Sequence, residues 1–114
     1  MILGIIPQTS NAESLLNNLS EADFKLKDVS IIMRDLKLRN AIASDSGPLK
    51  GVTVDTLSKR LAQSAMSSSE IKTCMDALGQ NKVLVVIACS PEGEKAATEM
   101  LKDASAEFIK VLPK

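Results

Sequence analysis

Two short aliphatic segments constrain the fold of this chain more than any other feature. They cover residues 2–6 and 83–88, and in both of them the apolar residues occupy odd and even positions alike. Successive side chains of a strand point to opposite faces of a sheet, so a strand of this composition needs apolar cover on both faces. We therefore expect both segments to be central strands of a sheet that is covered on both sides.

Each aliphatic segment begins a similar series of strand, helix and strand. After the first, Ser10–Glu13 has the Ser-x-x-Glu form of a capping box, an amphipathic helix follows, and residues 28–34 alternate as a second strand. After the second, Ser90 is placed as the N-cap of another helix, and residues 108–112 form the closing strand. The repeated order predicts an internal structural duplication.

The segment between the two series is different in character. Residues 40–51 are small and polar, which is typical of a mobile loop. Two helices are predicted after them, over 54–65 and 68–79, with Thr53 as the cap of the first and Ser67–Glu70 as a capping box of the second. A chain of 114 residues forms one domain with one modest core. We therefore predict a single domain over 1–114, with halves 1–39 and 66–114 joined by a loop and helix at 40–65.

The order of elements predicts an α+β protein of ferredoxin-like type, β-α-β-(α-α)-β-α-β. Two βαβ units in tandem can form one four-stranded, mainly antiparallel sheet with both crossover helices on one face. The other face is then covered by the helices of 54–79 or by a partner subunit. A doubly wound parallel α/β sheet is the structural alternative.

The first half resembles the bacterial general stress or heat-induced stress protein domain. Residues 24–32 read Phe-Lys-Leu-Lys-Asp-Val-Ser-Ile-Ile, and the family has Phe, a few polar residues and then Asp-Ile-Ser-Val-Val. In the second half the similarity runs through Val83-Leu84-Val85-Val86, Ala96, Leu101 and Ala106-Glu107. The resemblance implies two βαβ halves and a stress-associated or regulatory role with no settled biochemical activity.

Composition argues against several classes of function. The chain has 14 basic and 14 acidic residues, so it has no surplus positive charge for nucleic acid. It has no histidine, which is the commonest general base and zinc ligand and the usual partner of a nucleophile. We expect a non-enzymatic protein with no metal and no cofactor.

The same sequence indicates a cytoplasmic location. Two cysteines are too few for a disulfide framework, and the chain opens without the basic and apolar regions of a secretory signal. Its aliphatic segments are far shorter than the roughly 20 residues needed to cross a bilayer. We therefore expect no membrane contact.

The two turns from strand to helix are candidate binding sites. Ser10 and Asn11 lie at the first turn, and Ser90 and Gly93 lie at the second. Free backbone N–H groups at a helix N-terminus bind anions, so a phosphorylated metabolite or a nucleotide is the candidate ligand. Capping of the two helices is the alternative interpretation.

Cys89 is the candidate reactive group. It ends an aliphatic strand directly before a predicted helix, where partial positive charge favours a thiolate. This position suggests a thiol redox sensor; the alternative is a small apolar residue that ends the strand. Cys74 shares the apolar stripe of its helix with Ile71 and Leu78, which favours a place in the core.

Arg34, Lys37 and Arg39 form a local basic cluster after the second strand. Such a cluster can bind an acidic partner, or it can be an ordinary solvated loop. Taken together, these features favour a regulatory interaction module that forms a homo-dimer through a sheet face or the helices of 54–79. A small-molecule sensor and the Cys89 redox sensor are the alternatives.

Overall fold

The computed structural model describes residues 1–43 and 45–112. Within these ranges one four-stranded sheet has the order β2-β3-β1-β4. The two aliphatic segments are its central strands, as the sequence predicted. The strands are β1 Ile2–Ile6, β2 Val29–Ile32, β3 Val83–Ile87 and β4 Phe108–Val111.

Every pair of neighbouring strands in this sheet is antiparallel. The protein is therefore α+β, and the alternative prediction of a doubly wound parallel sheet is wrong. Ile2 lies opposite Ile87 and Ile6 lies opposite Val83. The chain consequently leaves β1 and β3 at opposite ends of the sheet, which decides where the functional candidates lie.

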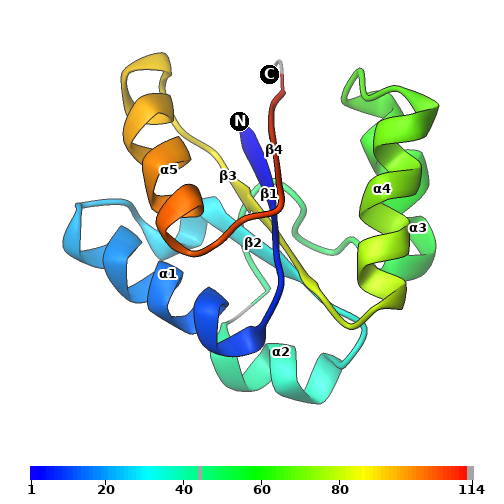
Figure 1. Cartoon of the computed structure of the whole chain (residues 1–114), viewed down its shortest axis with the longest axis horizontal. Coiled ribbons are helices and arrows are strands. Elements are labelled where there is room, and N and C mark those ends of the chain that lie inside the picture. The colour runs from blue at the N-terminus through cyan, green and yellow to red at the C-terminus, as the bar shows by residue number, and fades with distance from the viewer. Residues whose placement is uncertain (44, 113–114) are drawn as a thin grey trace.

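Two helices cover one face of the sheet: α1 (Thr9–Glu21) and α5 (Pro91–Asp103) (Figure 1). Side chains at alternate strand positions, including Ile2, Val85 and Ile87, pack beneath them in one apolar cluster. The Asn11 amide donates to the Ala104 carbonyl oxygen at 3.1 Å, which ties the start of α1 to the end of α5.

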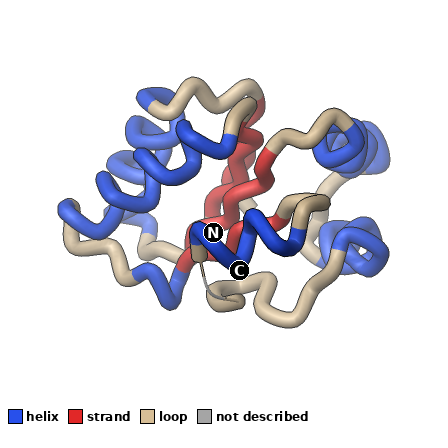
Figure 2. The backbone as a smooth tube through the Cα atoms, turned by 90° about the horizontal axis from the view of Figure 1, so that it is seen from below, coloured by secondary structure: helices blue, strands red, loops and turns tan. Residues whose placement is uncertain are grey.

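The other face is covered by α3 (Val54–Gln63) and α4 (Ser68–Gly79), so helices lie on both sides of the strands (Figure 2). The intervening strand positions, such as Leu3 and Val86, pack there against Leu57, Leu61 and other apolar side chains. Of the two predicted sources of cover, the helices of the chain itself therefore provide it.

The segment after β2 differs from the prediction. A short helix, α2 (Leu36–Ile42), follows β2, and Asp35 caps it by accepting the Leu38 N–H at 3.0 Å. A 3-10 helix, η1 (Leu26–Asp28), precedes the same strand. With 7 residues in α2 and 3 in η1, both elements are too short to show the apolar periodicity from which helices are predicted.

The predicted loop continues into a segment that packs on the edge of the sheet. The Ser30 hydroxyl donates to the Ser46 carbonyl oxygen at 2.6 Å and accepts the Leu49 N–H at 2.8 Å. Leu49 is buried, and Gly47 lies against the β2 backbone. We call residues 45–49 the strap. The strap is held by hydrogen bonds and a core side chain, so it is not the freely mobile loop that its composition indicated.

Helix starts follow the predicted caps in three cases and not in the fourth. Thr53 is the N-cap of α3, as predicted. Ser67 and Glu70 form the reciprocal capping box of α4, and Ser90 accepts the Gly93 N–H at 3.3 Å as the N-cap of α5. The box predicted at Ser10 is wrong, because α1 already begins at Thr9 and its N-cap is Gln8. Ser10 therefore lies inside the first turn.

Candidate functional site

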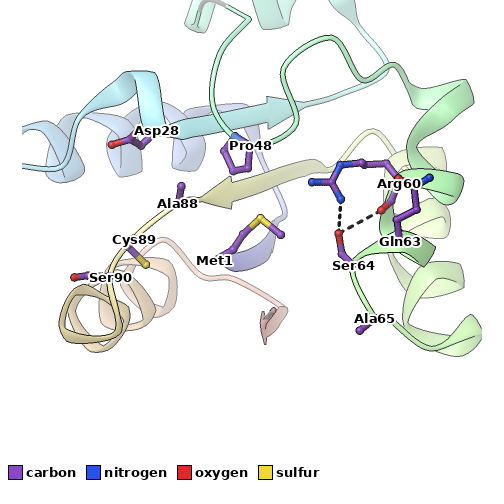
Figure 3. Close-up of a pocket in the computed structure, with 10 residues that line it drawn as sticks. All are labelled: Met1, Asp28, Pro48, Arg60, Gln63, Ser64, Ala65, Ala88, Cys89 and Ser90. Carbon is purple, nitrogen blue, oxygen red and sulfur yellow. Dashed lines mark hydrogen bonds between the residues drawn. The ribbon is translucent and has the colours of Figure 1, made fainter. Parts of the chain in front are cut away.

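A cleft of about 800 Å³ opens between α3, the strap and the end of β3 (Figure 3). Its volume is within the range of about 300–1,000 Å³ found for small-molecule pockets. We call it the Arg60 cleft, after the positively charged side chain that lines it. The residues that line it are far apart in the sequence: Met1, Asp28, Pro48, residues 60 and 63–65, and residues 88–90.

The register of the sheet assembles the cleft. Because Ile2 pairs with Ile87, Met1 lies beside the turn that follows β3, where Ala88, Cys89 and Ser90 line one side. The last turn of α3 lines the facing side, and Pro48 of the strap contributes a further wall (Figure 3). The hydrogen bond from Ala88 N–H to the Asp28 carbonyl oxygen, at 2.8 Å, holds the turn against β2.

Arg60 is half-buried, and its guanidinium extends from α3 toward Pro48 and Met1 (Figure 3). Its Nη1 donates to the Ser64 hydroxyl at 2.6 Å, and Ser64, which is only 6% exposed, caps the C-terminus of α3. Across residues 1–43 and 45–112, no carboxylate forms an ion pair with this guanidinium. The cleft therefore contains a positioned cation whose charge the described chain does not neutralise.

Cys89 and Ser90 lie on the side of the cleft opposite Arg60. Cys89 is half-buried, and the Ser90 side chain is engaged in capping α5. Glu92 and Glu94 occupy the first turn of that helix, and their negative charges offset the partial positive charge of its N-terminus. Of the predicted site residues, Cys89 and Ser90 line the cleft, and Gly93 is not among its lining residues. Gly93 is a neighbour of Cys89, since a Cβ built on Gly93 would lie 3.4 Å from the Cys89 Cβ.

Ser10 and Asn11 lie at the other end of the sheet. Ser10 is exposed and its hydroxyl contacts the Asn11 side chain at 3.4 Å. The Asn11 amide is engaged with Ala104, at the C-terminal end of α5 and therefore remote from Ser90. The turns after β1 and β3 have similar sequence patterns. Because these two strands are antiparallel, the turns lie at opposite ends of the sheet.

The basic cluster of the sequence is divided among contacts within the chain. Arg34 donates to the Gly79 carbonyl oxygen at 3.4 Å, and Arg39 lies 3.8 Å from the Asp45 carboxylate. Lys37 is exposed on α2. Arg34 and Arg39 therefore contact different parts of the molecule, and none of the three residues lines the Arg60 cleft.

Sequence reasoning missed Arg60 and Ser64. The only signal for Arg60 is its place in the last turn of a helix, where a cation is common because it complements the helix dipole. Nothing in the local sequence indicates that this turn faces Cys89, since the two are brought together only by tertiary packing.

Cys74 belongs to the core and not to the cleft. It is fully buried in the cluster beneath α4. Burial raises the pKa of the Cys74 thiol to about 11, and the Glu70 carboxylate adds to the effect. Cys74 is therefore a neutral thiol at physiological pH.

Among the described residues, no group of three or more Cys, Asp or Glu side chains is arranged to hold a metal ion. Within the same ranges, none of the helices combines the length and apolar character that crossing a membrane requires. Comparison of the chain with models of protein families, with curated proteins and with solved structures finds no match. The stress-protein resemblance therefore stays a prediction, and the site has to be interpreted from its own geometry.

Proposed function

We propose that this protein is a non-enzymatic binding module that takes a small anionic molecule into the Arg60 cleft. The observation that carries the proposal is the half-buried guanidinium, which has no carboxylate partner in the described chain and faces open space. A partly desolvated cation is unfavourable unless an opposite charge or hydrogen-bond acceptors compensate it. A bound anion supplies that compensation.

The orientation of Arg60 supports recognition of an anion. Guanidinium carries five N–H donors in a planar fork, and Ser64 engages only Nη1 in the contacts described above. Because Ser64 is buried and itself held to the Arg60 carbonyl oxygen at 3.3 Å, the fork is positioned before a ligand arrives. A positioned fork loses less conformational entropy on binding than a freely rotating side chain.

Binding without catalysis is favoured because the described residues that line the cleft do not form a set of cooperating catalytic groups. The chain has no imidazole to activate the Cys89 thiol. Ser64 and Ser90 are both engaged in capping helices. The Cys89 redox sensor stays an alternative, and the position of this thiol in the cleft is what favours it.

Binding is tested by two-dimensional NMR of the full chain, with acetate and inorganic phosphate as probes. We expect saturable shifts of the amide signals of Ala65 and Cys89, which lie on opposite sides of the cleft. The shifts should be lost in Arg60→Gln and retained in Lys59→Gln, a matched control at an exposed position on the same helix. Equal shifts in both variants would show that Arg60 is not the anchor.

We also propose the ferredoxin-like arrangement as the finer description of the fold, supported by the strand order and by α1 and α5 on one face. We further propose a regulatory role, which the resemblance at residues 24–32 supports. A signalling role is consistent with a domain that binds a ligand and performs no chemistry on it.

A further inference from the structure

We infer that the ligand of the Arg60 cleft is a molecule with one carboxylate and an aliphatic body, and not a phosphorylated metabolite or a nucleotide. The inference rests on the proposed function, because it specifies the anion that the cleft accepts. It follows from three properties of the cleft: its charge, its lining and the geometry of its donors.

The charge of the cleft matches a single negative charge. Arg60 is the only basic side chain in the described lining, and its guanidinium can compensate one negative charge. Asp28, on another side of the cleft, repels an anion, and this repulsion grows with the charge of the anion (Figure 3). The amino group of Met1 lies 3.9 Å from the Glu94 carboxylate and 3.4 Å from the Leu112 carbonyl oxygen, so it already has its own partners. A phosphate monoester carries about 1.5–2 negative charges at neutral pH, which one guanidinium beside acidic residues does not balance.

The lining suits an aliphatic body. Met1, Pro48, Ala65 and Ala88 contribute apolar surface, and the Cys89 thiol is itself weakly polar. The chain has only two aromatic residues, Phe24 and Phe108, and neither lines the cleft. A nucleobase would therefore find no ring to stack on, whereas burial of methylene groups needs no such partner.

The donor geometry favours a carboxylate. The planar fork of arginine matches the two oxygens of a carboxylate in a bidentate pair. Ser64 holds one side of the fork at 2.6 Å, so the remaining donors face the open cleft in a defined plane. The two oxygens of a carboxylate lie in one plane and can accept hydrogen bonds from two of these donors at once.

The test compares octanoate with octyl phosphate, adenosine monophosphate and neutral octanol, each titrated into the full chain at one ionic strength and below any micelle-forming concentration. Binding is followed through the amide signals of Ala65 and Cys89. We expect octanoate to bind most tightly. Octanol should bind about tenfold more weakly or worse, because it lacks the charge-assisted hydrogen bonds.

Variants link the preference to the guanidinium. Arg60→Gln should weaken octanoate binding by at least about tenfold, and Arg60→Lys should give a smaller loss because it keeps the charge and not the fork. Lys59→Gln should bind octanoate with the same affinity as the protein without substitutions. Thermal unfolding of each variant checks that the fold is intact, and Arg60→Lys provides a second test if Arg60→Gln is unstable.

The possible outcomes distinguish failure of the carboxylate inference from failure of the proposed anion-binding function. Tighter binding of octyl phosphate or the nucleotide, still dependent on Arg60, would overturn the carboxylate inference and leave the anion-binding function standing. Equal binding of octanol and octanoate would overturn the inference as well. If none of the anions shifts the cleft signals, both are wrong.

Discussion

The two cysteines have the same side chain and different chemistry because their surroundings differ. Cys89 borders the cleft, whereas Cys74 has no exposed surface and lies among the side chains that α3 and α4 pack on the sheet. The apolar stripe on which Cys74 lies favoured a place in the core, whereas the strand end at Cys89 left two interpretations open, a reactive thiol and a small apolar residue. The contrast leads to a prediction about pH.

We expect the stability of the protein to fall as the pH rises from about 9 to about 11, in part because of Cys74. In the unfolded chain this thiol ionises near its ordinary pKa of 9.0, whereas burial raises its pKa to about 11 in the folded protein. Between these values the unfolded state binds fewer protons, so deprotonation favours unfolding; below pH 9 the contribution is fully present.

Denaturant unfolding across this pH range, compared between the unchanged chain and Cys74→Ala, isolates the effect. The variant should be less stable at neutral pH, because it leaves a small cavity, and should lose less stability between pH 9 and 11. Parallel pH profiles of the two proteins would contradict the role assigned to burial of this thiol.

Among the elements, the strap can pack on β2 only with a glycine at position 47. Gly47 has φ +81°, and a Cβ at this position would lie 2.5 Å from the Val29 carbonyl carbon and 2.6 Å from the Ser30 nitrogen. Both are backbone atoms of the sheet edge and cannot move aside cheaply. Gly51 has φ +80° and no atom within 4 Å of the same position, which makes it a matched control.

Gly47→Ala should therefore destabilise the protein by about 1–3 kcal/mol more than Gly51→Ala. Both substitutions incur the cost of a left-handed conformation, about 1–2 kcal/mol, and only the first also forces the strap away from β2. Denaturant unfolding measures the difference, and equal losses would mean that the strap does not lie against the strand. Because Pro48 lines the Arg60 cleft, Gly47→Ala should also perturb the amide signals of Ala65 and Cys89.

In the whole molecule, the apolar sheet faces from which self-association was predicted are not free for a second subunit. That prediction came from a sheet with two apolar faces, and helices of the chain itself cover both of them. One sheet edge, β2, is lined by the strap. The other edge is β4, where Val111 is 49% exposed and the only charged side chain, Lys110, is held by Glu70 at 3.0 Å.

If the protein forms a dimer, we expect the contact to be at the β4 edge, because an unprotected edge strand pairs readily with another strand. Sedimentation velocity at micromolar concentration should then show a dimer that Val111→Lys dissociates. A strict monomer would contradict self-association, and a dimer that survives Val111→Lys would contradict the β4 contact.

Most of the elements, and the two strands at the centre of the sheet, could be predicted from local patterns in the sequence. Aliphatic residues at odd and even positions identified β1 and β3 as central strands, and the Ser67–Glu70 box placed the start of α4. These signals are local, since they depend on side-chain periodicity and on hydrogen bonds within one turn. The prediction failed at α2, which is too short to show an apolar stripe, and at the start of α1, where the Ser-x-x-Glu pattern lies inside the helix and does not cap it.

Which distant residues come into contact depends on tertiary packing and could not be predicted from local patterns. The direction of strand pairing put Ser10 and Asn11 at one end of the sheet and Ser90 at the other, and it brought Met1 beside Ala88. Packing of α3 then carried Arg60 to the side of the cleft facing Cys89. Contacts between such distant segments depend on how whole layers pack, and no periodicity within one segment encodes them.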